Sequence, residues 1–193
     1  MLIVITGLDG SGTSSIANKL NELDKDSYLF RTPSKEYTER KFMDEVIMKE
    51  SGVAHLLYYL SSVVFMSDYI KKHCDYKNKN VYMVRYLVDT VVSNRASGFS
   101  IDLDYNIYGN QLLEPDLTIF VNLREEERQR RMLMRGKDTL DEKLDDNLLR
   151  AKFLREYKKL LDSEKTIYVD NDDDLDKVVM ELKKKIDEYM NKK

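Results

Sequence analysis

The first 23 residues constrain the fold most, because an apolar run, a glycine-rich segment and an amphipathic segment follow one another over 2–23. A strand that enters a glycine-rich turn and then a helix directs backbone N–H groups and the positive end of a helix dipole at one point, where phosphate can bind. The Walker A pattern of such loops is Gly, four residues, Gly, Lys, then Ser or Thr. Gly7, Gly12 and Ser14 match this pattern, whereas Thr13 stands in the position of the lysine.

The loss of that lysine removes a positive charge from the place where the negative charge of the β- and γ-phosphates must be held. Backbone donors alone can still bind phosphate, but fast phosphoryl transfer needs a cation from elsewhere. The strand before the loop and the helix after it favour phosphate binding despite Thr13. We therefore predict that the nucleotide cofactor contacts Gly7, Gly10, Ser11, Gly12, Thr13, Ser14 and Ser15.

The rest of the chain alternates between short apolar runs and helical periodicity, which is typical of an α/β fold with a parallel sheet. We expect strands at 2–5, 28–31, 81–84, 117–121 and 166–169. Helices are expected at 14–23, 35–50, 53–74, 87–97, 102–113, 125–134, 143–161 and 175–190. This order predicts the three-layer sandwich of P-loop NTPases, in which a five-stranded parallel sheet has helices on both faces.

Length and composition exclude several classes of protein. A chain of 193 residues suits one domain (1–193) with a short lid. The net charge of -3 offers no field for nucleic acid or an anionic membrane. We find no run long and apolar enough to span a bilayer, and the lone Cys74 excludes an internal disulfide. These features predict a soluble, cytoplasmic protein.

Four polar residues directly follow predicted strands: Asp9, Arg31, Arg85 and Asn122. The carboxyl ends of parallel strands share one edge of the sheet, where α/β proteins bind their ligands. We therefore expect these residues to outline one active-site crevice.

Several fragments, in this order, resemble the thymidylate kinases, which are P-loop nucleoside monophosphate kinases, and the resemblance covers nearly the whole chain. The fragments are Gly-Leu-Asp-Gly-Ser-Gly at 7–12, Phe-Arg-Thr-Pro at 30–33, His-Leu-Leu-Tyr at 55–58, Arg-Tyr at 85–86, Glu-Pro-Asp-Leu at 114–117 and the arginine-rich segment 128–135. The resemblance implies that ATP phosphorylates a nucleoside monophosphate such as dTMP, with Mg²⁺ bridging the phosphates.

The resemblance also implies roles for individual residues. Asp9 is expected to be the loop carboxylate that positions the reacting groups, and Ser14 the hydroxyl that coordinates Mg²⁺. Arg31 and Arg85 are expected to hold the acceptor phosphate, since a planar guanidinium can bind two phosphate oxygens. Tyr58 is expected to stack on the acceptor base.

Three departures from the family pattern concern the acceptor. Val84 stands where an acidic residue is usual, and Ser61 or Ser62 replaces the arginine that reads the base. The aromatic residue that checks the sugar is missing near Asn94, which we take as a fourth substrate-binding residue. Because a site discriminates between bases through such contacts, an acceptor other than dTMP is an open alternative.

The arginine-rich segment is expected to form a lid at about 128–142 that closes over the transferring phosphoryl group. Arg131 and Arg135 are predicted to be catalytic, and either could replace the charge that Thr13 lacks. A solvated helix face with salt bridges would show the same spacing.

Two further expectations concern function and assembly. A catalytically silent nucleotide-binding protein of the same fold is the alternative to an enzyme, since Thr13 weakens catalysis more than binding. The resemblance also implies a homodimer through the long apolar helix, with Phe65, Met66 and Tyr69 as candidate contacts.

Overall fold

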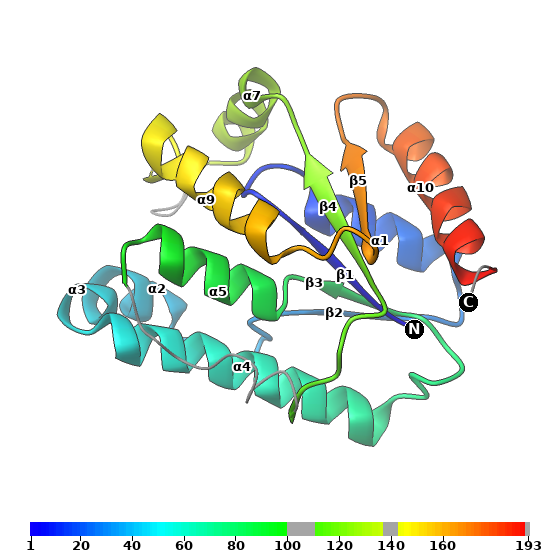
Figure 1. Cartoon of the computed structure of the whole chain (residues 1–193), viewed down its shortest axis with the longest axis horizontal. Coiled ribbons are helices and arrows are strands. Elements are labelled where there is room, and N and C mark those ends of the chain that lie inside the picture. Colours follow the sequence, from blue (N-terminus) through cyan, green and yellow to red (C-terminus); the bar gives the residue numbers. More distant parts are fainter. Residues whose placement is uncertain (100–110, 137–142, 192–193) are drawn as a thin grey trace.

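A computed structural model describes residues 1–99, 111–136 and 143–191 of the chain. Its centre is a five-stranded parallel sheet in the order β2-β3-β1-β4-β5 (Figure 1). The strands are β1 (Leu2–Gly7), β2 (Tyr28–Arg31), β3 (Val81–Val84), β4 (Leu117–Asn122) and β5 (Thr166–Asp170). The predicted fold class and all five predicted strands are therefore confirmed.

Helices cover both faces of this sheet, as Figure 1 shows. One face carries α1 (Thr13–Leu23) and α10 (Leu175–Met190), which pack against each other. The other face carries α4 (Gly52–His73), α5 (Leu87–Ala96) and α9 (Asn147–Leu160). At the carboxyl end of the sheet, α7 (Glu125–Arg135) follows β4. A short helical segment before α4 consists of α2 (Arg40–Phe42), the π-helical η1 (Met43–Ile47) and α3 (Met48–Glu50).

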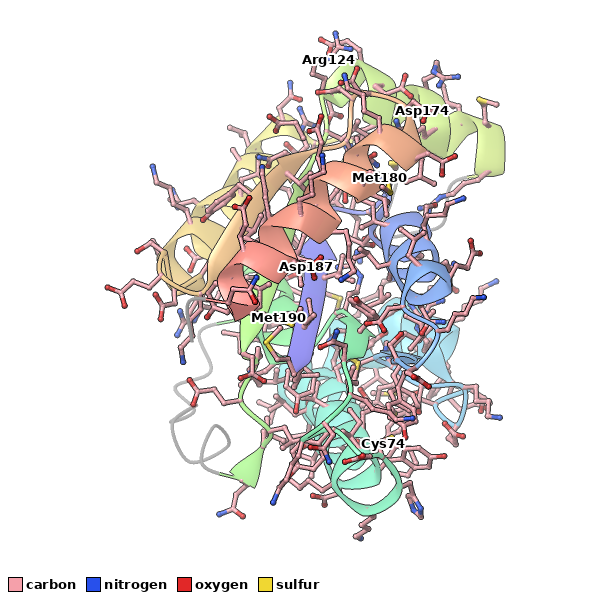
Figure 2. The ribbon with its side chains drawn as sticks, turned by 90° about the vertical axis from the view of Figure 1, so that its right-hand side faces the viewer. Cys74, Arg124, Asp174, Met180, Asp187 and Met190 are labelled. Carbon is pink, nitrogen blue, oxygen red and sulfur yellow. The ribbon has the colours of Figure 1, made fainter. Side chains whose placement is uncertain are left out.

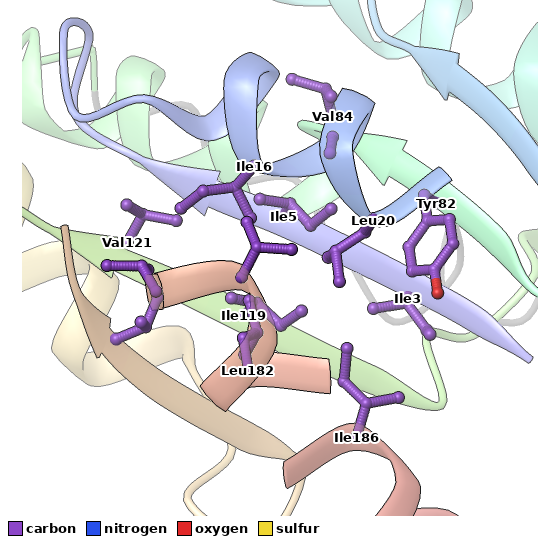
Figure 3. Close-up of a cluster of buried hydrophobic side chains, with 14 of the residues drawn as sticks. Ile3, Ile5, Ile16, Leu20, Tyr82, Val84, Ile119, Val121, Leu182 and Ile186 are labelled. Carbon is purple, nitrogen blue, oxygen red and sulfur yellow. The ribbon is translucent and has the colours of Figure 1, made fainter. Parts of the chain in front are cut away.

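Side chains alternate between the two faces of the central strands, and each face has its own apolar core. Ile3 and Ile5 of β1 point toward α1 and α10, where they meet Leu20 and Leu182 (Figure 3). All four of these side chains are fully buried. Burying an aliphatic side chain of this size contributes about 1.5–3 kcal/mol, so this cluster fixes α1, and the loop before it, against the sheet.

The opposite face of the sheet supports the helices that surround the predicted crevice. Leu2 and Val4 of β1 pack with Val63, Met66 and further residues of α4. A separate cluster joins α5 and α9 to β4. Met66 is only 3% exposed within this core, so the prediction that it lies in a subunit contact is wrong. It fills the core because its helical position faces the sheet.

Two helix predictions need correction. The helix predicted at 35–50 begins only at Arg40, because residues 34–37 form a turn in which the Tyr37 amide donates to the Ser34 carbonyl. The helix predicted at 143–161 is interrupted, and α9 begins after Asp146, whose carboxylate accepts from the amides of the first turn. The helix predicted at 102–113 falls mostly outside the described residues, as does the second part of the predicted lid.

By length and composition alone, α4 could cross a membrane, which corrects the expectation that no segment could. In this structure, however, α4 lies along the sheet and contacts α5 and η1. Buried core helices of globular domains pass the same test, so this finding is weak support for a membrane span.

Candidate active site

The glycine-rich loop runs between β1 and α1 and is packed on two sides. Gly10 (φ +86°) and Gly12 (φ +96°) adopt left-handed backbone conformations, which glycine tolerates best. A Cβ on Gly10 would lie 2.8 Å from Met132 of α7, and a Cβ on Gly12 would lie 2.3 Å from the side-chain nitrogen of Asn171. The loop conformation and its close contacts therefore both require glycine at these two positions.

The loop and the first turn of α1 present groups that suit a nucleotide phosphate chain. Gly12 caps α1 without a side chain, so the first amides of the helix have no intrahelical acceptor and no side-chain cap. The buried hydroxyl of Ser11 has no hydrogen-bond partner among the described residues. Ser14 and Ser15 are exposed in the same turn. These donors fit ATP, and the accessible hydroxyl of Ser14 fits an oxygen ligand of Mg²⁺.

Arg85 is the centre of an ion-pair network next to this loop. It follows β3, and its guanidinium lies 2.5 Å from the Asp9 carboxylate and 3.0 Å from that of Asp89. Asp89 is buried and also accepts from the hydroxyls of Thr6 (2.6 Å) and Tyr157 (2.9 Å). Burial opposes the charge of Arg85, but the two carboxylates outweigh it and raise the pKa of Arg85. The network holds a permanent cation at the edge of the loop.

The backbone of Arg85 is itself unusual. Its φ of +63° is the only positive value at a non-glycine position among the described residues. Such conformations cost about 1–3 kcal/mol and persist where surrounding contacts determine them. Here the Arg85 amide donates to the Ile5 carbonyl, and both nitrogens of its guanidinium fork bond to carboxylates. The strained backbone therefore aims this side chain at the loop.

A cavity of about 560 Å³ adjoins the network. Its size lies in the usual range for small-molecule sites. Its lining includes Asp9, Arg85, Asp89 and Asn94, together with Thr32 and Pro33 after β2, Arg40, Lys41 and Asp44 of α2 and η1, His55, Tyr59 and Ser62 of α4, and Lys143. The cavity thus extends from the phosphate-binding loop to the space between η1, α4 and α5.

Asn94 is the most informative polar group in this cavity. It is 5% exposed, and neither its amide nitrogen nor its amide oxygen has a hydrogen-bond partner among the described residues. A buried polar group without a partner costs about 1–3 kcal/mol. Asn94 is therefore well suited to bind a ligand that offers one donor and one acceptor.

A carboxylate also lies on the wall of the cavity. Asp44 accepts from the Tyr59 hydroxyl (2.7 Å) and bonds to His55 Nε2 (2.9 Å). Burial opposes ionisation of Asp44, but these two hydrogen bonds outweigh it and lower its pKa. His55 therefore takes part in a polar wall of the cavity.

The structure brings together some of the predicted substrate residues and not others. Arg85 and Asn94 line the cavity. Among the described residues that line it, neither Arg31 nor Tyr58 is present. Partial burial and repulsion from Arg40 and Arg85 lower the pKa of Arg31, which places these three cations near one another. Tyr58 packs edge-on against Tyr59, the aromatic residue that does line the cavity.

The arginines near the loop have three different surroundings. Arg124 precedes α7 and bonds to Asp172 at the exposed rim, near the start of α10 (Figure 2). Arg128 is 1% exposed and donates to the Asp9 carbonyl, so it holds the loop against α7. Arg131 lies beside Gly12, and the exposed Arg135 ends α7 one turn further on.

Sequence reasoning missed Asp89, Asp44 and Asn171. Asp89 stands four residues after Arg85, a helical ion-pair spacing that could have identified it in place of the acid missing at Val84. Asn171 follows β5 at the edge of the sheet where Asp9 and Arg85 lie, so its position was a usable signal. Asp44 meets His55 only because η1 packs on α4, which no local pattern predicts.

The comparison with protein families agrees with this geometry. The family model described as thymidylate kinase matches residues 5–182. The chain belongs to the thymidylate kinase family. Among curated proteins, a probable thymidylate kinase from Archaeoglobus fulgidus is 27% identical over 206 residues, covering 100% of this chain and 98% of its own length.

Solved structures show the same fold. A thymidylate kinase from Candida albicans superposes with a TM-score of 0.74 at 23% identity, covering 100% of this chain and 93% of its own. A deoxyadenosine kinase from M. mycoides, with dCMP and dCDP bound, gives a TM-score of 0.73 at 18% identity, covering 97% and 100%. At 23% and 18% identity, the likeness of this thymidylate kinase family member to the two solved structures shows the fold alone.

Proposed function

We propose that the protein transfers the γ-phosphoryl group of ATP to a nucleoside monophosphate. The observation that carries this proposal is the contact between Asp9 and Arg85, because it joins the phosphate-binding loop to the cavity. A carboxylate and a guanidinium at this junction are the groups needed to position an acceptor phosphate against a donor phosphate. Membership of the thymidylate kinase family supports the same reaction class.

On the donor side, the backbone amides of the loop and the Ser11 hydroxyl would hold the phosphates of ATP. Ser14 would contribute a ligand to Mg²⁺. When bound, the metal would neutralise charge that develops on the phosphates. The protein's own part is to orient the phosphate chain along the start of α1 and to keep Arg85 directed at its end.

On the acceptor side, Arg85, with Arg31 and Arg40 nearby, would hold the monophosphate. Asn94 would then meet the base, since it lies about 10 Å along α5 from the helix start at Leu87. The unpartnered amide of Asn94 supports this role. Because Ser61 or Ser62 stands where the family has the arginine that reads thymine, we propose that Asn94 determines which base is preferred. The nucleotide dTMP is then one of several acceptors to be tested.

The proposal includes a homodimer, which the family resemblance implies. Every fourth residue of α4 from Val53 to Tyr69 forms a stripe on its outer side, and the apolar members Val53, Leu57, Phe65 and Tyr69 are between 39% and 48% exposed. A stripe of this kind on one helix suits burial against a second copy.

The test is ADP release from ATP and Mg²⁺ in the presence of each common nucleoside monophosphate and deoxynucleoside monophosphate. We expect release that depends on the acceptor, and its strong reduction in the Arg85→Ala variant. A silent nucleotide-binding protein is the second candidate, favoured by Thr13. It would bind ATP in calorimetry without releasing ADP for any acceptor.

A further inference from the structure

We infer that Glu127 and Asn171 are positioning residues that hold Arg131 beside Gly12, so that Arg131 supplies the positive charge that the loop lacks at Thr13. This inference rests on the proposed phosphotransferase function. It concerns how a loop without its lysine can still stabilise phosphoryl transfer.

Asn171 connects the loop to the edge of the sheet. It is 2% exposed, its side-chain amide donates to the Ser11 carbonyl (2.8 Å), and its backbone amide donates to the Asn122 carbonyl (2.9 Å). Its own backbone carbonyl accepts from Nη2 of Arg131 at 2.9 Å. Asn171 is therefore fixed between β4, the loop and the guanidinium of Arg131.

Glu127 fixes the other side of the same guanidinium. Its Oε1 accepts from Nε of Arg131 at 2.7 Å, one turn earlier on α7. With Nε and Nη2 both bonded, Nη1 is the remaining nitrogen of the Arg131 guanidinium. It lies 3.6 Å from the position that a Cβ would take on Gly12. The described residues provide no hydrogen-bond partner for Nη1, so this nitrogen is available to an anion in the loop.

Two neighbouring arginines of α7, Arg128 and Arg130, do not meet these conditions. Arg128 is buried, and its guanidinium bonds to Glu125, the Asp9 carbonyl and the Leu144 carbonyl. Arg130 also pairs with Glu127, but its side chain is 61% exposed and bonds to Met134. Of these three arginines, only Arg131 combines a guanidinium restrained at two nitrogens with a third nitrogen that lies beside the loop and has no bond to the described residues. This is the arrangement of a cation held in position before its substrate binds.

A cation that is already held in position is effective, because the protein need not rearrange when negative charge develops on the transferring phosphoryl group. Arginine groups that act on transferring phosphoryl groups are worth about 10³–10⁵ in kcat. Misplacing such a group by about 1 Å can lower the rate about 100-fold. The role of Glu127 and Asn171 is therefore to fix a position, whereas Arg131 touches the phosphates.

The experiment measures kcat and KM with ATP and the best acceptor, for single variants and for the same variants carrying Thr13→Lys. In the natural loop we expect Arg131→Ala to lower kcat about 1,000-fold. Glu127→Ala and Asn171→Ala should each lower it about 100-fold with little change in the KM of the acceptor. With Thr13→Lys, all three losses should shrink to about tenfold or less, since lysine returns the charge.

Arg130→Ala is the matched control, because it removes an arginine from the same helix and the same glutamate without touching the loop. It should leave kcat within about twofold of the natural protein. Glu127→Gln keeps an acceptor oxygen for Arg131 and should retain most activity. Circular dichroism melts of each variant separate misfolding from misplacement.

Equal losses in both backgrounds would overturn the inference that Arg131 replaces the lysine. Unchanged kcat in Glu127→Ala and Asn171→Ala would overturn the positioning role. If the natural protein releases no ADP with any acceptor, the proposed function fails instead. The inference is then tested by calorimetry, which measures the affinities for ATP and for ADP. Arg131→Ala must lose the preference for ATP over ADP, and Thr13→Lys must restore it. An unchanged preference in Arg131→Ala would refute the inference.

Discussion

The hydroxyl of Tyr157 on α9 donates a 2.9 Å hydrogen bond to Asp89 on α5, across 68 positions of the chain. Both side chains are buried. Because Asp89 also pairs with Arg85, the orientation of the arginine depends on a helix that does not line the loop. Burial and the Asp89 carboxylate raise the pKa of Tyr157, so its hydroxyl stays protonated as a donor at any physiological pH.

Substitutions of Tyr157 and Asp89 should have different effects on the free energy of unfolding and on acceptor binding. Tyr157→Phe removes one hydrogen bond to a charged group, and we expect unfolding in urea to show a loss of about 2 kcal/mol. Asp89→Ala leaves Arg85 with Asp9 as its remaining carboxylate partner and removes the acceptor of the Thr6 and Tyr157 hydroxyls, so it should cost about 4 kcal/mol. It should also raise the KM of the acceptor monophosphate. An acceptor KM that stays constant in Asp89→Ala would show that Asp89 does not orient Arg85.

The glycine-rich loop offers a comparison between two glycines with similar backbones. Gly12→Ala would place a Cβ 2.3 Å from Asn171, so we expect calorimetry to show no ATP binding. Gly98 has φ +82° and nothing within 4 Å of its Cβ position, so Gly98→Ala adds only backbone strain of about 1–2 kcal/mol. Retained ATP affinity in Gly12→Ala would mean that nucleotide binds elsewhere.

Asn94→Leu should produce opposite effects on stability and binding. The buried amide has no partner among the described residues, so an apolar side chain of similar size should maintain or raise the melting temperature. Acceptor affinity should fall at least tenfold, measured by calorimetry with the preferred monophosphate. A large loss of stability with unchanged acceptor affinity would identify Asn94 as a structural residue instead.

The pH dependence of the Glu127 contact has a defined sign. Hydrogen bonds from Arg130 and Arg131 lower the pKa of Glu127 from its ordinary 4.5 to about 2. Its stabilising contribution is therefore complete above about pH 4.5 and is lost as the pH falls through about 2. We expect the ratio of kcat between the natural protein and Glu127→Gln to be the same at pH 5.5 and pH 8. A ratio that changes between them would show that Glu127 titrates in this range.

The proposed dimer can be tested on the outer stripe of α4. Phe65 and Tyr69 are 39% and 40% exposed and contact each other. Phe65→Glu should convert a dimer into a monomer in light scattering at micromolar concentration. Met180→Glu, an exposed apolar position on α10, is the control and should leave the mass unchanged. A natural protein that is already monomeric would exclude this contact.

Local patterns predicted the fold well because they depend on neighbours in sequence. Continuous apolar runs identified all the strands of the described residues, and the glycine-rich loop identified the edge where the candidate site lies. The start of the helix at Arg40 was missed because the turn at 34–37 has no glycine and closes through a backbone hydrogen bond. The π-helical η1 likewise has no distinctive residue pattern.

The residues of the candidate site could be predicted only where they belong to a sequence motif. Asp9, Arg85 and the loop residues lie together, as the order of strands and motifs implied. The pairing of Asp44 with His55, and of Tyr157 with Asp89, depends on packing between elements distant in the chain. Tyr59 rather than Tyr58 lines the cavity, since a shift of one residue rotates a helical side chain by about 100°.

The strand order β2-β3-β1-β4-β5 has a consequence for how this protein can change. With β1 in the middle, Arg85, Asp44 and Asn94 come from the segment before residue 97, whereas α7 and Asn171 come from the segment after β4. Under the proposed function, the loop between β1 and α1 therefore lies between the acceptor contacts on one side and α7 and Asn171 on the other. Selection or engineering could vary the acceptor contacts of η1, α4 and α5 while the loop, α7 and Asn171 continue to hold ATP.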